Sequence, residues 1–362
     1  MIGHGTPDPS WQGVTWIAVP QNFRLPRMGN ALLRRARFVV RMGLGRLFTS
    51  LHGRVVMETL LRGPVYDAIR LVEADLYIVN DWSALPAVAV SAPATARVVF
   101  DAHEFAPLEW EHSAMFRWRD APMIRHVLKT YGRRCDATVT VCQPIADRYA
   151  REYGFAPIVV RNVPALVDIP APRARGDGFV RLVHHGGAVP ARRLELMIHA
   201  VAAAEPRFTL TFMLVGDGAY IADLRRLAEQ HAPGRVFFVD PVPPTAIAAR
   251  IAEFDMGLFL LETRIYNYEV ALPNKLFDFI MGGLAVCVGP SPTMAELVSE
   301  YGCGVVTPSL RPDDVARTLA SIDEVALTRM RAAAVRARHE LNAGREMTKV
   351  TQLVRSLLSR TA

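Results

Sequence analysis

The stretch NYEVALPNKLFDFIMGGLAV, Asn267 to Val286, predicts a helix followed by a tight turn and a buried strand. Pro273 suits the first turn of a helix, and the apolar residues from Leu276 onward recur at the i, i+3, i+4 spacing of a buried face. The pair Gly282-Gly283 provides the stop before the apolar run LAVCVG. We therefore expect a helix that begins near Asn274.

Lys275 is the unusual residue of this helix, because it is one of only three lysines among 42 basic side chains. A cation in the first turn opposes the helix dipole, which favours anions there by about 0.3–1 kcal/mol. Three explanations fit: a solvated side chain, an ion pair with Asp278 three residues later, or an anionic ligand shared by Lys275 and the helix start. The stretch alone leaves all three open.

The whole chain has the composition of a globular protein with room for two domains, since 51% of its 362 residues are hydrophobic and 21% are charged. The formal net charge of +7 is unevenly distributed, because residues 11–57 contain eight arginines and no Asp or Glu. The remainder of the chain is close to neutral. We therefore expect no nucleic-acid partner.

The cysteines do not form a metal-binding pattern. They are scattered, with no CxxC pair and no cluster of histidines nearby: Cys135, Cys142, Cys287 and Cys303. We therefore expect no metal cofactor and a reducing, cytoplasmic environment. The chain also has no run of about 20 apolar residues and no signal-peptide pattern at its start, which agrees with a cytoplasmic location.

Short β-branched runs alternate with longer amphipathic ones along most of the chain. The expected strands are ADLYIVN, ARVVFDAH, ATVTVC and APIVVRN in the first half, and VRLVHHGG, LTFMLVGDG, RVFFVD, MGLFLLE and LAVCVG in the second. Helical stretches such as LELMIHAVAAA, ADLRRLAEQHA and PTAIAARIAEF lie between them. This alternation predicts an α/β protein with two doubly wound, Rossmann-like domains and a ligand crevice between them, at the carboxyl ends of the strands.

A Pro- and Gly-rich seam from Val163 to Gly178 interrupts the pattern and marks the domain boundary. We expect an N-terminal domain over residues 1–164 and a C-terminal domain over residues 165–335. The segment from Val325 onward reads as helix to the terminus, and residues 336–362 are expected to pack back toward the first domain.

In the first half, polar residues follow the strand of RVVFDAHEF: Asp101, His103 and Glu104. A histidine between two carboxylates can be held in one tautomer and can contact a sugar hydroxyl or a phosphate. The same residues also suit a capping cluster for the next helix. Both interpretations stay open.

In the second half, HHGGAVPARRLELMI places Gly186 and Gly187 after a strand, and Arg192 and Arg193 at an expected helix start. Glycine lets the backbone approach a ligand closely, and an arginine at a helix start opposes the dipole as Lys275 does. A diphosphate shared by both helix starts would reconcile these cations with their positions. Solvated arginines are the plain alternative.

These motifs follow one another in an order that resembles the GT-B glycosyltransferases of the retaining family 4 (group 1), from about Ala74 to Leu319. LVGDGAYIADLRRLA is similar to the family's Val-Gly-x-Gly turn, and FDMGLFLLE and VVRNVP are similar to two of its strands. HHGGAVPARRLELMI and NYEVALPNKLFDFIMGGLAV resemble the segments that hold the donor diphosphate. DAHEF resembles the acceptor-side strand end of the first domain.

The resemblance implies a role for each candidate. The catalytic candidates, which would neutralise the two phosphates or face the transferred sugar, are Arg192, Lys275 and His103. The donor-binding candidates are Gly186, Gly187, Gly216, Asn267, Glu269, Asn274 and Asp278. In this set Asp278 would accept hydrogen bonds from the ribose, whereas Asn267 and Glu269 stand near Val270, where the family has an acid. Asp101 and Glu104 are acceptor-side candidates.

The function implied is a retaining, metal-independent transferase without a cofactor, which moves a sugar from a nucleotide-diphosphate donor to a hydroxyl of a glycan or lipid-linked acceptor. The alternatives are a nucleotide-sugar 2-epimerase and a catalytically silent GT-B module that binds or scaffolds. The family begins with a strand and a glycine-rich loop, whereas residues 1–20 read as though the chain starts at the second strand. A missing first strand would favour the silent module.

The segment from Arg24 to Arg46 sets arginines among apolar side chains and contains no acid. It either packs on the first domain with its arginines solvated or docks peripherally on an anionic membrane surface, at the inner face of the cell membrane.

Overall fold

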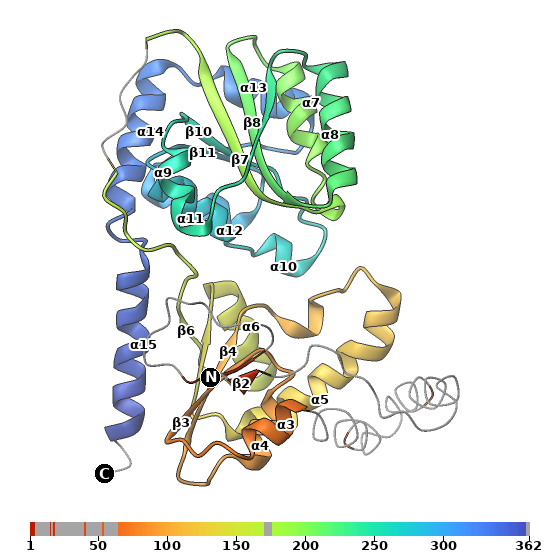
Figure 1. Cartoon of the computed structure of the whole chain (residues 1–362), viewed down its shortest axis with the longest axis vertical. Coiled ribbons are helices and arrows are strands. Elements are labelled where there is room, and N and C mark those ends of the chain that lie inside the picture. The colour runs from red at the N-terminus through yellow and green to blue at the C-terminus, as the bar shows by residue number, and fades with distance from the viewer. Residues whose placement is uncertain are drawn as a thin grey trace. The chain divides into compact units, whose positions relative to one another are not determined.

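The chain forms two compact units, Met1–Val160 with Thr351–Ala362, and Arg161–Val350 (Figure 1). A computed structural model describes residues 1–3, 15, 17–18, 40, 53, 64–169 and 176–359. We expected the boundary between residues 164 and 165, and we expected residues 336–362 to pack toward the first domain. The division falls between residues 160 and 161, and Thr351–Ala362 belong to the first unit. Each unit contains a parallel sheet and helices, as the alternating pattern predicted.

The first unit has a four-stranded parallel sheet in the order β3-β4-β5-β6. Its strands are those expected from the first half of the sequence: β3 Leu76–Asn80, β4 Arg97–Ala102, β5 Ala137–Thr140 and β6 Ile158–Val159. Near the start of the chain, β1 (Ile2–Gly3) and β2 (Ile17–Ala18) pair in parallel as a separate two-stranded sheet.

Helices and aromatic side chains complete the first unit. The helices described there are α3 Pro64–Ile69, α4 Leu85–Ser91, α5 Ala121–Tyr131 and α6 Gln143–Tyr153, with a π-helical turn at Phe116–Asp120. The fully buried rings of Phe105 and Tyr149 have centroids 4.9 Å apart. Leu357, near the end of the chain, packs against Val99 and Val139 of the sheet.

The second unit has a six-stranded parallel sheet in the order β12-β11-β10-β7-β8-β9. Its strands are β7 Val180–Ala188, β8 Phe208–Gly216, β9 Val236–Val239, β10 Met256–Phe259, β11 Ala285–Val288 and β12 Gly304–Val306. The strand order reverses between β7 and β10. In doubly wound sheets ligands bind at the carboxyl ends of the strands beside such a reversal.

Eight helices of the second unit connect these strands or follow them in the described residues: α7 Glu195–Ala203, α8 Gly218–His231, α9 Ile247–Ile251, α10 Tyr266–Glu269, α11 Asn274–Met281, α12 Pro292–Tyr301, α13 Pro312–Ala320 and α14 Glu324–Ala337. The helix expected at Asn274 therefore begins where it was predicted. None of the described helices is long and apolar enough to cross a bilayer.

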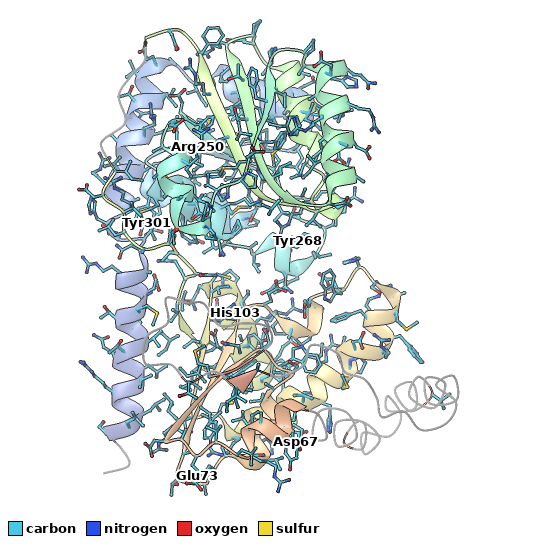
Figure 2. The ribbon with its side chains drawn as sticks, in the orientation of Figure 1. Asp67, Glu73, His103, Arg250, Tyr268 and Tyr301 are labelled. Carbon is cyan, nitrogen blue, oxygen red and sulfur yellow. The ribbon has the colours of Figure 1, made fainter. Side chains whose placement is uncertain are left out.

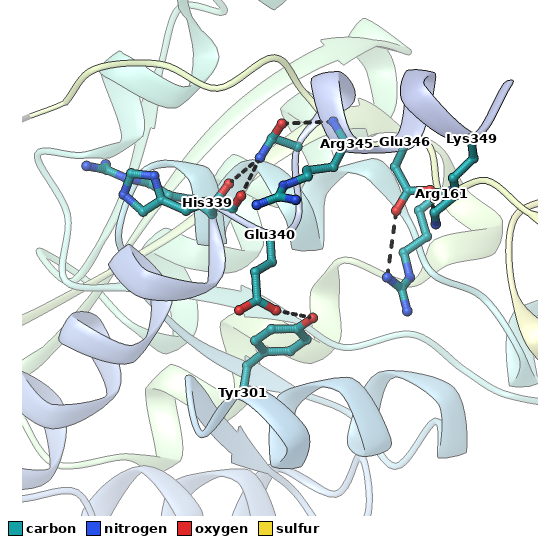
Figure 3. Close-up of polar contacts among 9 residues, drawn as sticks. Arg161, Tyr301, His339, Glu340, Arg345, Glu346 and Lys349 are labelled. Carbon is teal, nitrogen blue, oxygen red and sulfur yellow. Dashed lines mark hydrogen bonds and ion pairs between the residues drawn. The ribbon is translucent and has the colours of Figure 1, made fainter. Parts of the chain in front are cut away.

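The final helical region is not continuous, contrary to our expectation of helix to the terminus. Helix α14 ends at Ala337 and α15 runs over Ala343–Leu358. Asn342 stabilises the interruption, because its side-chain amide donates to the carbonyl of His339 at 2.9 Å and its oxygen accepts from the Arg345 N–H at 3.2 Å (Figure 3). A side chain that bonds the backbone in this way favours a helix start over a helix interior.

A buried carboxylate fixes the start of α15 (Figure 3). Glu346 is only 3% exposed and accepts hydrogen bonds from the Arg161 backbone N–H at 3.0 Å and from Lys349 Nζ at 2.5 Å. The guanidinium of Arg161 lies 3.7 Å from the other carboxylate oxygen. Glu346 thus joins the first residue of the second unit to the start of α15.

Candidate functional site

The carboxyl end of β7 consists of small residues. Gly186 has φ 112°, in the left-handed region that favours glycine. A Cβ at Gly186 would lie 3.3 Å from Lys275 Nζ, and a Cβ at Gly187 would lie 3.6 Å from Arg192 Nη1. The Gly-Gly pair therefore leaves room for two cationic side chains beside the strand-order reversal.

Lys275 lies in the first turn of α11 and is buried, with 7% of its surface exposed. Its Nζ is 3.3 Å from His184 Nε2 and 4.9 Å from the centroid of the Phe259 ring. Neither contact supplies a negative charge. Lys275 is therefore not a solvated side chain, and in the described part of the chain it makes no direct ion pair with Asp278.

Helix α11 holds Lys275 at this place because its other residues are buried. Pro273, with ψ 146°, is the N-cap residue of α11. The sequence predicted it within the first helical turn, whereas it directly precedes that turn. Leu276, Phe279 and Ile280 are fully buried in the core of the unit. Burial of that face fixes the helix, and the helix start carries Lys275 toward β7.

Burial and nearby charge shift the pKa values of Lys275 and of two neighbouring groups. Desolvation, together with the nearby Arg192, lowers the pKa of Lys275 to about 7. Desolvation also raises the pKa of Asp278 to about 6 and lowers the pKa of His185 to about 4. His185 Nε2 lies 3.4 Å from Asp278 Oδ2, but a histidine with this pKa is neutral near pH 7, so the contact is not a salt bridge.

The two arginines after β7 have different environments. We expected both at the start of a helix, but Arg192 ends the 3-10 turn Pro190–Arg192 and α7 begins only at Glu195, so the helix-dipole argument was wrong for them. Arg193 adopts φ 51° and its Nη1 lies 2.7 Å from Glu262 Oε1. Arg192 has no ion pair with any residue that the structure describes.

Other predicted donor-side residues lie around the same sheet edge. Gly216 ends β8 with φ 114°, and a Cβ there would lie 3.6 Å from the carbonyl of Ala188. Asn267 is buried within α10, whereas Glu269 and Asn274 are exposed. The structure thus brings Gly186, Gly187, Arg192 and Lys275 together.

In the first unit, His103 follows the end of β4 (Figure 2). Its Nε2 lies 3.1 Å from Asp101 Oδ2, and this hydrogen bond is the main cause that raises the pKa of His103. Burial raises the pKa of Glu104. The 3-10 turn that follows, Ala106–Leu108, has no side-chain cap, so the capping interpretation of these residues was wrong.

Two neighbours of the predicted residues were not anticipated. Asp81 directly follows β3 with φ 63°, an uncommon conformation for a residue other than glycine, and its charge contributes to the raised pKa of His103 and of Glu104. His184 was not singled out, because it lies within an apolar strand. The pair His184-His185 in that strand could have indicated a functional role, because buried polar side chains require hydrogen-bond partners.

The described residues contain no group of three or more His, Cys, Asp or Glu side chains that could hold a metal ion. The positive charge near the carboxyl end of β7 comes from Lys275 and Arg192.

Part of the sequence matches a known family, and the fold is similar to that of known sugar-transferring enzymes. Residues 23–169 match the family described as Glycosyltransferase Family 4. The pneumococcal O-GlcNAc transferase GtfA, solved with UDP and GlcNAc, has a similar fold, with a TM-score of 0.63 at 14% identity over 82% of this chain. The two units are Rossmann-like and together match the GT-B fold of such structures. This chain spans 60% of the length of GtfA.

Two further GT-B structures are similar over more of their length. Sucrose-phosphate synthase of Thermosynechococcus elongatus has a TM-score of 0.66 at 16% identity, covering 99% of this chain and 89% of its own. HepE of Anabaena, solved with UDP-glucose, has a TM-score of 0.63 at 14% identity, covering 90% of this chain and 96% of its own. No protein of curated function matches the sequence.

Proposed function

We propose that the protein is a glycosyltransferase that moves a sugar from a nucleotide-diphosphate donor to a hydroxyl acceptor, with retention of configuration and without a metal. The family match and the fold support transfer of a sugar, and similar structures are known with UDP or UDP-glucose bound. The acceptor proposed is a glycan or a lipid-linked intermediate. The basic segment from Arg24 to Arg46, proposed to meet an anionic membrane, lies outside the described residues except for Val40.

One observation carries the proposal: Lys275 and Arg192 lie beside the same Gly-Gly pair, and no carboxylate of the described residues is in direct contact with either. Two unpaired cations close together repel each other, which is one reason why the pKa of Lys275 is low. An anion with two charged groups would relieve this repulsion. A diphosphate at the carboxyl end of β7, beside the strand-order reversal, satisfies both the charge and the topology.

Each candidate then has a chemical task. Lys275 and Arg192 bind the diphosphate and stabilise the charge that develops on it when the bond to the sugar breaks. Asp278, ionised above pH about 6, accepts hydrogen bonds from the ribose hydroxyls. His103, held by Asp101, contacts the transferred sugar or the acceptor. The rate then comes mainly from positioning and electrostatic stabilisation, with no general base required of the protein.

Replacement of the two cations tests the proposal. We expect Lys275→Ala and Arg192→Ala each to lose at least roughly 10²-fold in donor turnover, the scale seen when one preorganised charge-stabilising group is removed. Arg193→Ala is the matched control, since Arg193 is already paired with Glu262. Turnover is measured as nucleotide release from a panel of nucleotide sugars. Wild-type rates in both cation variants would refute the diphosphate site.

Metal independence is tested separately. Because Lys275 and Arg192 supply the positive charge that a metal otherwise brings, we expect turnover to persist in excess EDTA. Loss of turnover that magnesium or manganese restores would contradict this. Binding of nucleotide sugars without any turnover would instead favour the silent binding module.

A further inference from the structure

We propose that His184 is a positioning residue that holds the Lys275 ammonium at Gly186 through a hydrogen bond to a neutral acceptor, and so leaves its charge available to the ligand. The inference rests on the proposed function, because it concerns how the diphosphate-binding lysine is prepared. His184 itself lies in β7 and is fully buried, so it is not expected to touch the ligand.

The hydrogen bonds of His184 fix its tautomer. Its Nδ1 lies 2.9 Å from the carbonyl oxygen of Leu258, and a carbonyl can only accept, so Nδ1 carries the proton. In a neutral imidazole the other nitrogen is then an acceptor. Nε2, 3.3 Å from Lys275 Nζ, therefore accepts from the ammonium.

The surroundings keep His184 neutral. Burial and the adjacent Lys275 charge lower its pKa well below the usual value. Aromatic rings enclose it: Phe259 stacks on the imidazole with centroids 5.9 Å apart, and Phe212 packs edge-on at 5.8 Å. Phe259 also lies under Lys275 Nζ, so one ring supports both side chains.

The choice of acceptor matters for the charge of the site. A carboxylate in place of His184 would orient Lys275 equally well, but it would cancel the charge and repel a diphosphate. The titratable or charged groups that face this pair are Asp278 from α11, His185 from β7 and Arg192 from the 3-10 turn. Arg192 opposes the charged form of Lys275 and Asp278 favours it. The hydrogen bond that Lys275 donates to His184 adds to the support of the ammonium.

The experiment compares substitutions at position 184 that keep or remove the acceptor. His184→Phe and His184→Leu fill the site without one, whereas His184→Gln can still place an oxygen near Lys275. His199→Phe makes the same change at a half-buried histidine of α7 and serves as the matched control. Binding of UDP and GDP is measured by calorimetry from pH 6 to 9, with thermal melting to verify folding.

We expect acceptor-free variants that fold to bind the nucleotide about 10-fold more weakly at pH 7, the loss expected for one hydrogen bond to a charged group. Loss of the acceptor also disfavours the charged form of Lys275. As the pH is raised, the affinity of these variants therefore begins to fall at a lower pH than that of the wild type. His184→Gln recovers most of the affinity. A purely structural role would weaken binding without moving this pH dependence.

Two results separate this inference from the proposed function. If Lys275→Ala abolishes nucleotide binding but a folded acceptor-free variant binds with wild-type affinity and pH dependence, His184 does not position Lys275. If the wild type binds neither nucleotide, the proposed function fails, and the role of His184 fails with it.

Discussion

Lys275 is held at the expense of stability. Its ammonium is buried beside another cation, with a neutral histidine as its hydrogen-bond partner. Burial of a charge without an opposite charge disfavours the folded state. Residues that bind charged ligands often carry such a cost, because the groups that would stabilise the empty site would also compete with the ligand.

This cost predicts the effect of Lys275→Met on stability. The folded-state pKa of about 7 lies below the usual value for lysine, so between pH 7 and about 10 the unfolded chain binds a proton that the folded chain has released. Stability of the wild type therefore rises with pH in this window through Lys275. We expect Lys275→Met to be more stable than the wild type at pH 7, by on the order of 1–4 kcal/mol, and the gain to shrink toward pH 10.

Denaturant unfolding at pH 7, 8.5 and 10 measures this difference. Most other groups titrate alike in both proteins, so their contributions to the difference in stability cancel. A gain that stays constant with pH, or a less stable variant at pH 7, would contradict the buried charge.

At the scale of elements, the contact between β10 and α11 sets the position of Lys275. Gly257 lies in β10, and a Cβ there would meet the Phe279 ring of α11 at 2.2 Å. Only a glycine lets the helix lie this close to the strand. The helix start is thereby fixed against the sheet beside β7, the neighbour of β10.

We expect Gly257→Ala to destabilise the second unit by roughly 1–3 kcal/mol, the usual cost of overpacking a core. It should also weaken UDP binding, because Phe279 cannot move without its helix. Gly218→Ala is the control: nothing lies within 4 Å of its added Cβ, and α8 begins at this residue. Unfolding free energies of both variants, with and without UDP, test the link between packing and site.

The elements show what sequence can predict. Strands such as β7 and β8 were predicted because long β-branched runs are local signals. Strand β12 was missed because Gly304–Val306 is too short to form a pattern. The start of α7 was misplaced because Pro190 resembles a first helical residue, although it opens a 3-10 turn. The partner of His184 lies 74 residues away, at Leu258, so no local pattern could reveal its role.

At the scale of the whole molecule, the chain passes from one unit to the other after Val160 and again after Val350. Glu346 lies near both passages and binds Arg161, the first residue of the second unit. Such a carboxylate joins two segments that are far apart in the sequence. Its loss should therefore affect the second unit as a whole.

We expect Glu346→Ala to lower the melting temperature of the second unit by at least about 2 °C. The substitution leaves the Arg161 N–H without its acceptor, at a cost of about 1–3 kcal/mol, and a unit of this size loses roughly 2–4 °C per kcal/mol. Glu340→Ala is the matched control, because Glu340 is exposed and the hydrogen bond that it accepts from the Tyr301 hydroxyl is long, at 3.4 Å (Figure 3).

The two units need not unfold in one transition, so scanning calorimetry is required to measure each melting temperature. The transition that shifts should be the one that UDP raises, since both the proposed nucleotide site and the described partners of Glu346 belong to the second unit. An equal shift in Glu340→Ala, or a shift confined to the other transition, would show that Glu346 does not hold this unit together.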